Sequence, residues 1–392
     1  MGARLTGRSR VCRLHGRVEG TATIVAVFVV VIVGAVIAGG YFVAAQQFRI
    51  GKAGRQANAA FYAAEAGISA ASAAWNVSIL DSLEPGETKL LVSGELWTGD
   101  RYDVTVTRLD TAQHQHTTYF LSTSTGLAHG PWGGRRQVAQ ILRRQLPDSL
   151  CCEAALETQG EVRITDGAAI SGQDSELAGY ECSNPGAGNR AGVLTDQGGQ
   201  ITLQEGGTID GVPAEGRREA DGVEFLARAE VWFSELASDP DIEYAGGDSV
   251  GALAPAVEGD GSCARSVASN WGAPGQNDHP CFGYFPIIYA GGDLTISSNA
   301  RGQGILLVEG DLRIAGEFEF QGLVVVRGTL TVGSGAGLYG GVLAFNTDRG
   351  SVSVTEGSQI SYSSCAVQRA LRGSKLYLPR PLAPYSWLEI LE

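Results

Sequence analysis

Residues 20–48 read GTATIVAVFVVVIVGAVIAGGYFVAAQQF, a run of 29 residues without a charge. About 20 apolar residues are enough to cross the hydrocarbon core of a bilayer, so residues 20–48 are predicted to be a transmembrane helix. An alanine-rich stretch follows and continues the helical pattern. We therefore expect one helix from Thr21 to Trp75, about 80 Å long at about 1.5 Å per residue.

Basic residues flank this run on both sides. Five arginines and one acid precede it, and Arg49, Lys52 and Arg55 follow it. The excess before the run favours a cytoplasmic N-terminus, with residues 1–19 as a basic leader and the later domains outside the inner membrane. The alternative is a cleaved signal peptide, with Val43-Ala44-Ala45 as its cleavage site. The length of the run and the continuing helical pattern favour a retained anchor.

Beyond the membrane the helix is predicted to be amphipathic and to support a sheet. Its apolar residues recur every three or four positions, at Phe61, Ala64, Ile68, Ala71 and Trp75. Short segments with alternating polarity then predict an antiparallel meander, which would pack on this face of the helix. These segments are residues 89–92, 102–109, 117–123 and 136–142.

Residues 60–67 read AFYAAEAG. Together with the apolar helix before it and the predicted sheet after it, this segment resembles PilX-type minor pilins, accessory subunits of type IV pili and related secretion pseudopili. The resemblance covers roughly residues 15–148. It implies a pilin-like helix and antiparallel sheet over residues 49–148, a role in pilus or pseudopilus assembly, and other pilin or pilus-assembly subunits as partners of the N-terminal helix.

The resemblance departs from the pilin pattern at one position. Pilins are usually cut after a glycine, and the fifth residue of the product is a glutamate. A cut after Gly20 would place Val25 at that position, and Glu19 would lie before the cut. Whether a prepilin peptidase processes this chain is therefore left open.

The C-terminal part of the chain repeats itself. Segments that begin at Pro286, Gly304, Gly322 and Gly341 align in steps of 18, 18 and 19 residues, and a second series follows each of them. Two short strands in each period, with glycine at the corners, predict a β-solenoid. The alternative is a sandwich of short strands. The predicted interior stack consists of Leu294/Ile296, Leu312/Ile314, Leu330/Val332 and Val352/Val354.

Two earlier segments, residues 160–172 and 199–211, resemble coils of the same kind. The chain is thus predicted to be α+β, with an all-β β-solenoid domain over residues 149–392 and insertions near 173–191 and 212–285. A stripe of apolar residues predicts a helix within the second insertion, at about residues 222–238. That helix and residues 364–372 are candidates to cover a side or an end of the solenoid. The tail from Leu376 is apolar enough to dock somewhere on the molecule.

Charge and cysteines restrict the compartment. Residues 1–55 hold 8 cations and 1 acid, so the remainder holds 29 − 8 = 21 cations and 42 − 1 = 41 acids, a net charge of −20. Such an acidic exterior argues against nucleic acid as a partner. Six cysteines follow the span, as expected of a disulfide-forming compartment. We expect Cys263 to pair with Cys281, because both lie in one loop-rich insertion; the other pairings are open.

The sequence predicts no catalytic residue, no cofactor and no metal site. Asp293 and Asp311 occupy matching places on successive repeats, about 5 Å apart, where paired acids could serve acid–base chemistry or hold Ca²⁺. An aspartate after glycine is also common in turns, and the next repeat has Thr329 at this place. His114 and His116 are expected in a solvated turn.

These observations predict a non-enzymatic, membrane-anchored accessory pilin-like protein whose solenoid head is presented for adhesion, with a surface glycan or a protein as its ligand. The alternative is a membrane-anchored enzyme or binding module that acts on cell-envelope or extracellular polysaccharide. A structural solenoid that polymerises end to end is a third hypothesis. The ligand, the place in a filament, and the choice between pilus and secretion pseudopilus are not determined by the sequence.

Overall fold

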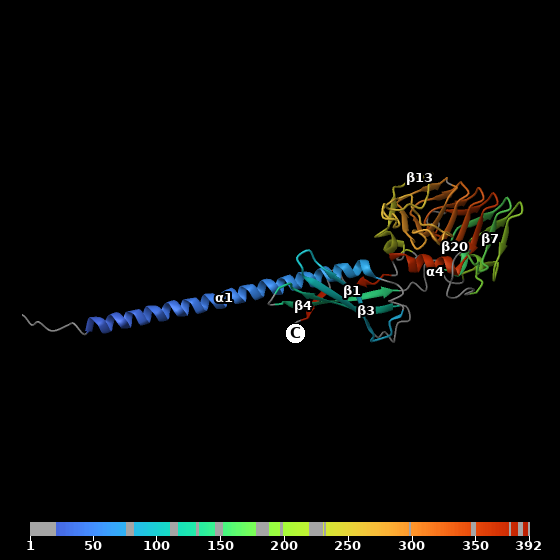
Figure 1. The fold of residues 1–392 in the computed structure, drawn as a ribbon. Helices are drawn as coiled ribbons and strands as arrows, with labels where there is room; N and C mark the ends of the chain where they lie inside the picture. The colour runs from blue at the N-terminus through green and yellow to red at the C-terminus, as the bar shows by residue number, and fades with distance from the viewer. Residues whose placement is uncertain are drawn as a thin grey trace, which may run out of the picture.

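In a computed structural model the chain forms a long N-terminal helix, an antiparallel sheet beside its second half, and a larger β-rich body (Figure 1). The architecture is α+β, as predicted. The structure describes residues 21–75, 82–109, 117–130, 133–145, 152–177, 188–196, 199–218, 230, 233–297, 299–345, 350–375, 378–382 and 387–390.

The helix α1 (Thr21–Ala74) has 54 residues and confirms the predicted element to within one residue. Its two halves lie in different surroundings. Large apolar side chains are exposed along the first half, for example Ile24 at 70% and Phe42 at 63%, whereas Ala63 and Ala64 in the second half are fully buried. Within the described part of the chain, one helix is long and apolar enough to cross a membrane, and it is this one.

The four predicted strands of the antiparallel sheet are present and pair in chain order, β1-β2-β3-β4. Side chains that alternate between the helix and solvent explain their polarity pattern. Val104, Val106 and Phe120 are fully buried under α1. The strands are β1 (Thr88–Glu95), β2 (Arg101–Arg108), β3 (Thr117–Leu127) and β4 (Arg135–Gln145).

The C-terminal tail returns to this sheet. The strands β23 (Arg380–Pro381) and β24 (Trp387–Ile390) both pair antiparallel with β4. The predicted domain of residues 149–392 is therefore wrong for the tail, which belongs to the antiparallel sheet. The physical reason is that β4 offers an open edge whose backbone groups need partners, and the apolar tail supplies them.

The larger body consists of two sheets of parallel strands. One has eleven strands, with the path β10-β7-β22-β20-β18-β16-β14-β12 and β5, β8 and β11 beside it; the other has seven, in the order β13-β15-β17-β19-β21-β6-β9. The strands before residue 251 are β5 (Ala154–Thr158), β6 (Glu161–Ile164), β7 (Ala169–Ser171), β8 (Ala191–Thr195), β9 (Ile201–Leu203), β10 (Thr208–Asp210), β11 (Glu215–Arg217), β12 (Ile242–Tyr244) and β13 (Asp248–Val250). The later strands are β14 (Ile287–Ala290), β15 (Leu294–Ile296), β16 (Arg301–Val308), β17 (Leu312–Ile314), β18 (Glu319–Val326), β19 (Leu330–Val332), β20 (Gly337–Ala344), β21 (Ser351–Val354) and β22 (Gln359–Tyr362).

The repeat determines the register of these strands. Leu294 lies opposite Leu312, Leu312 opposite Leu330, and Leu330 opposite Val352, and the second residues of the predicted pairs match in the same way. All eight side chains are at most 1% exposed. One detail of the alignment was wrong: Gly322 pairs with Gly340 and not with Gly341, so this step is 18 residues as well.

The spatial order of the repeats differs from their order in the chain. The early strand β6 pairs with β21, and β9 pairs with β6. The two early segments therefore extend the stack beyond its last repeat, whereas β12 and β13 begin it at the opposite end. All repeats present similar parallel edges, so the sequence pattern does not determine which edges meet.

The helix α4 (Ser364–Gly373) covers a side of this stack and not an end. It packs across the neighbouring strands β16, β18 and β20, with Val367 and Ala370 buried (Figure 1). Its first turn is capped by the Ser363 side chain, which accepts a hydrogen bond from the Ala366 amide. Most of the helix predicted at residues 222–238 lies outside the described residues.

Candidate assembly and ligand surfaces

Small residues form the face of α1 that meets the antiparallel sheet. Ala60, Ala63 and Ala64 are fully buried there. A Cβ atom at Gly126 of β3 would lie 1.9 Å from the carbonyl oxygen of Ala60, and one at Gly67 would lie 2.2 Å from the Ser124 Oγ atom. The AFYAAEAG segment is thus a surface on which the helix backbone approaches the sheet directly.

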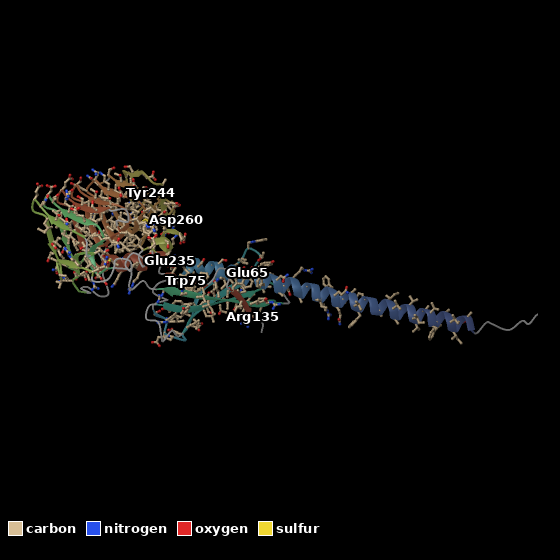
Figure 2. All side chains as sticks on the ribbon, turned by 180° about the vertical axis from the view of Figure 1, so that it is seen from behind. Glu65, Trp75, Arg135, Glu235, Tyr244 and Asp260 are labelled. Atoms are coloured by element: carbon tan, nitrogen blue, oxygen red, sulfur yellow. A yellow bond between two sulfur atoms is a disulfide. The ribbon has the colours of Figure 1, made fainter. Side chains whose placement is uncertain are left out.

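The predicted apolar stripe of α1 is only partly this face. Ala64 and Ala71 are buried, whereas Phe61, Ile68 and Trp75 are half-buried. The aromatic residues contact different parts of the chain. The ring centroid of Phe61 lies 5.4 Å from that of Trp387 in the tail strand, and the ring of Trp75 lies 6.5 Å from that of Phe120. Figure 2 shows Trp75 at the end of the helix that is nearest the parallel sheets.

The paired aspartates of the repeat have a structural function. The Asp293 Oδ1 atom accepts a hydrogen bond from the Asp311 amide at 2.9 Å, and the Asp311 Oδ1 atom accepts one from the Thr329 amide at 2.6 Å. Each carboxylate therefore joins one repeat to the next. Among the described residues, no group of three or more His, Cys, Asp or Glu could hold a metal ion. His114 and His116 lie outside the described residues.

A groove of about 340 Å³ lies on the flank of the parallel stack. It crosses three successive repeats, because residues 299–301, 317–319 and 335–339 all contribute to it. The Arg301 Nε atom forms an ion pair with the Glu319 Oε2 atom at 3.0 Å. Burial, and then the charge of Glu319, raise the pKa of Tyr339. Charged groups beside an aromatic ring make this groove a candidate ligand surface.

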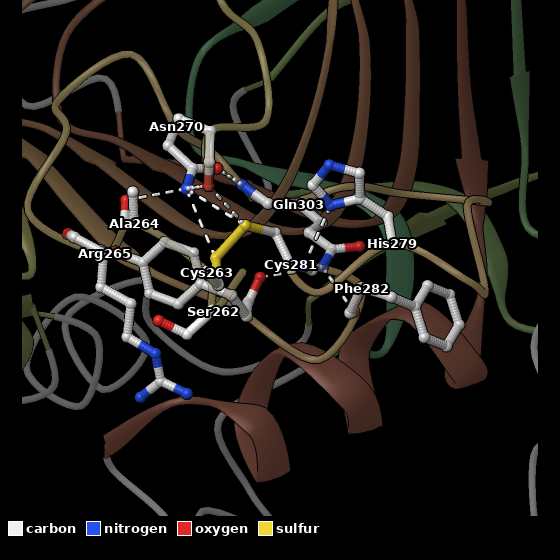
Figure 3. The surroundings of a disulfide bond; sticks show 12 residues. Ser262, Cys263, Ala264, Arg265, Asn270, His279, Cys281, Phe282 and Gln303 are labelled. Atoms are coloured by element: carbon white, nitrogen blue, oxygen red, sulfur yellow. Dashed lines mark hydrogen bonds between the residues drawn. A yellow bond between two sulfur atoms is a disulfide. The ribbon is translucent and has the colours of Figure 1, made fainter. Parts of the chain in front are cut away.

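The predicted disulfide between Cys263 and Cys281 is confirmed (Figure 3). It closes a loop of residues 263–281 within the segment that joins β13 to β14. Asn270 Nδ2 donates a hydrogen bond to the Ala264 carbonyl at 2.9 Å, and Gln303 Nε2 donates to the Tyr284 carbonyl at 2.8 Å. Gln303 belongs to β16, so this buried amide fastens the loop to the stack. Cys152 and Cys365 each take part in a disulfide bond as well.

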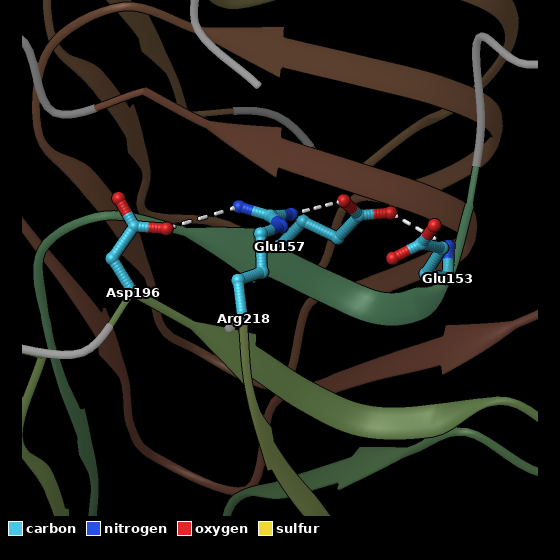
Figure 4. Close-up of polar contacts among 4 residues, drawn as sticks. All are labelled: Glu153, Glu157, Asp196 and Arg218. Atoms are coloured by element: carbon cyan, nitrogen blue, oxygen red, sulfur yellow. Dashed lines mark hydrogen bonds and ion pairs between the residues drawn. The ribbon is translucent and has the colours of Figure 1, made fainter. Parts of the chain in front are cut away.

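A buried ion-pair cluster was not predicted (Figure 4). Arg218, directly after β11, forms ion pairs with Glu157 of β5 and with Asp196, the latter at 3.4 Å. The Glu153 amide also donates a hydrogen bond to Glu157 at 2.7 Å. Burial raises the pKa of Glu157, and the charge of Arg218 opposes that effect. The partners lie 61 residues apart in the chain, and no local pattern in the sequence indicates the pair.

Comparisons with known proteins give little support for any assignment of family or function. No protein family and no curated protein matches it. Among solved structures, the competence-associated pilin ComZ from Thermus thermophilus matches 86% of this chain and 98% of its own, with 13% sequence identity and a TM-score of 0.23. A superposition of that quality carries no argument about fold or function.

Proposed function

We propose that this chain is an accessory, minor-pilin-like protein of a type IV pilus or a secretion pseudopilus. In this proposal α1 anchors it in the inner membrane, with residues 1–19 on the cytoplasmic side and the sheets outside. The supporting observation is the division of α1: its first half exposes apolar side chains, whereas its second half packs on an antiparallel sheet. A filament subunit needs both an apolar shaft and a folded body around its end.

The exposed half of α1 supports assembly as well as anchoring. Apolar surface of this length is unfavourable in water, and it is removed from water either by lipid or by the helices of other subunits. Val29 and Val31 are 52% and 61% exposed, so the described part of the chain covers neither of them fully. Other pilin or pilus-assembly subunits are the partners that fit this surface.

The C-terminal body is proposed to be a non-enzymatic β-solenoid head that is presented for adhesion. Its support is the constant 18-residue register of the parallel strands between β14 and β20. The aspartates that could have served catalysis are hydrogen-bonded to the backbone of neighbouring repeats.

The proposal is tested by substituting Val29 and Val31 with Asp in the full chain. Two carboxylates at the centre of the span should abolish membrane association and filament incorporation, measured by membrane flotation and by blotting of sheared filaments. The matched control is Leu90→Asp, at an exposed apolar position of β1, which should leave both unchanged. Unaltered incorporation of the double variant would contradict the proposal. Mass spectrometry of the mature N-terminus would show whether cleavage occurs after Gly20.

The flank groove favours a second candidate function, in which the anchored chain binds or cleaves polysaccharide. Glu317 and Glu319 both line the groove beside Tyr339. Substituting each with Gln tests it: loss of glycan cleavage by the full chain would indicate an enzyme, and loss of glycan retention alone would indicate a binding module. If the parent chain neither retains nor cleaves neutral or acidic glycans, this candidate fails.

A further inference from the structure

A pocket of about 650 Å³ lies between α1 and the start of β4. The helix contributes residues between Tyr41 and Ala57, and the sheet contributes residues 133–136. Figure 2 shows Arg135 at the end of the sheet from which the exposed half of α1 extends. Ala60, the first fully buried residue of α1, follows Phe48 by 60 − 48 = 12 residues, about 18 Å along the axis. The pocket therefore lies between the apolar run and the packed body.

The polar side of this pocket is cationic. Arg49, Lys52, Arg135 and Arg136 line it, and none of its described lining residues is an acid. Arg135 and Arg136 belong to the part of the chain after position 55, whose net charge is 21 − 41 = −20, so these two cations stand out from the acidic remainder. Arg136 also forms an ion pair with Glu389 of the tail strand at 3.2 Å, so β24 helps to position one of these cations. An anionic ligand fits this arrangement.

The other side of the pocket is apolar and continues the membrane-spanning run. Tyr41 and Phe48 line it and are 79% and 67% exposed. A span of about 20 residues that begins near Thr21 ends close to Tyr41, so the next turns of the helix lie at the level of the lipid headgroups. A ligand for this pocket thus needs an anionic head toward the sheet and an apolar tail along the helix.

We propose that the pocket binds an anionic phospholipid of the leaflet that faces the sheets. The phosphate is held by Arg49 and Arg135, and the acyl chains lie along Tyr41 and Phe48. This inference rests on the proposed membrane anchor and adds a specific lipid contact to it. The contact would hold the antiparallel sheet close to the membrane surface, at a fixed height along α1.

The test uses the full chain in non-ionic detergent, titrated with dioctanoyl phosphatidylglycerol or dioctanoyl phosphatidylcholine and observed by native mass spectrometry. We expect one phosphatidylglycerol to bind in preference to phosphatidylcholine, and glycerol phosphate not to displace it. Arg49→Gln with Arg135→Gln should weaken phosphatidylglycerol binding about 25-fold. That is about five-fold for each cation removed, from about 1 kcal/mol per Lys or Arg near an anionic surface.

The control removes two exposed cations elsewhere, by Arg101→Gln and Arg163→Gln, and should leave the affinity unchanged. Equal binding of the two lipids, or unchanged binding by the pocket variant, would overturn the lipid site. The lipid site would also be overturned if, in sedimentation, the parent chain were a dimer and the pocket variant a monomer. That result would assign the pocket to a second copy of the chain. Membrane flotation separates the proposals, because a chain that fails to float contradicts the anchor itself.

Discussion

The antiparallel sheet beside α1 and the stack of parallel strands are both β-rich, but they differ where they pack most closely: small residues let α1 approach its sheet, beside larger ones such as Val104 and Phe120. The helix meets its sheet through Ala60, Ala63 and Gly126, so that backbone approaches backbone. The parallel stack is filled by columns of leucine, isoleucine and valine that pack on equivalent residues of the next repeat.

This difference predicts which kind of substitution, to a larger or to a smaller side chain, each region tolerates. A junction of small residues has no room for a larger side chain, but it loses little when a methyl group is removed. A column of large aliphatic residues has the opposite sensitivity, because truncation leaves a cavity. The stack also has close backbone contact along columns of glycine, for example Gly304, Gly322 and Gly340. Each of these has a positive φ, and a Cβ at Gly340 would lie 1.9 Å from the carbonyl oxygen of Gly322.

The largest effect is expected for Leu312→Ala in the stack. Leu312 is 1% exposed and lies between Leu294 and Leu330, so the cavity should cost about 2–5 kcal/mol in free energy of unfolding. Urea unfolding measures the loss, and hydrogen exchange should show unchanged protection in β2 and β3. The outward-facing Arg313→Ala is the control, with an expected change within about 0.5 kcal/mol. Equal loosening of both regions would show that they are one cooperative unit.

A smaller loss of stability is expected for Gly126→Val in β3, where a side chain is added to a tight contact and no cavity is made. The added side chain meets the Ala60 carbonyl and must push the helix from the sheet, at a cost of about 1–3 kcal/mol. The comparison is Gly54→Ala, at an exposed helical position with nothing within 4 Å of the added Cβ. That change should stabilise α1 by up to about 1 kcal/mol, since alanine is the better helix former. Thermal unfolding should show a lower unfolding temperature for Gly126→Val and a higher one for Gly54→Ala. Stabilisation by Gly126→Val would refute the close approach of helix and sheet.

The tail strand β24 should contribute about 1 kcal/mol to the free energy of unfolding of the antiparallel sheet. Trp387→Ala removes the contact with the Phe61 ring, a kind of pair worth about 0.5–1.5 kcal/mol. Faster hydrogen exchange is expected in β4, whose edge the tail covers, while the parallel strands stay protected. Leu388→Ala, at a position that is 70% exposed, serves as the control. Unchanged exchange in β4 would mean that β24 does not stabilise this edge.

The smallest effect expected is the contribution of Glu157 to the pH dependence of the stack's stability. Burial raises the pKa of Glu157 above its ordinary value of 4.5. The folded state then holds the proton more tightly than the unfolded state, so this stability is fully present below pH 4.5 and is lost as the pH rises through the folded-state pKa. Urea unfolding across this pH range gives the free energy of unfolding of the parent chain and of Glu157→Gln. The value for the parent chain minus that for the variant should fall with rising pH. A rising difference would show that the attraction of Arg218 outweighs burial.

Much of the fold was predictable because its signals are local. The register of Leu294, Leu312 and Leu330 follows from a repeat of constant length, and the disulfide joins two cysteines in one insertion. The candidate ligand surfaces were harder to predict. The flank groove gathers Arg301, Glu319 and Tyr339 from three repeats, and none of these residues belongs to a recognisable motif. Asp293 and Asp311 were adjacent as expected, but their hydrogen bonds to the backbone became visible only in the structure.

The sequence by itself determined the apolar helix, the strands of the meander and the aliphatic columns, because hydropathy and periodicity along the chain specify which faces must leave water. Only the tertiary structure decided that the tail pairs with β4, that the early repeats stack beyond β21, and that Arg218 meets Glu157. Open strand edges and buried charges accept any partner of suitable geometry. Which partner they meet depends on distances in space that the order of residues does not contain.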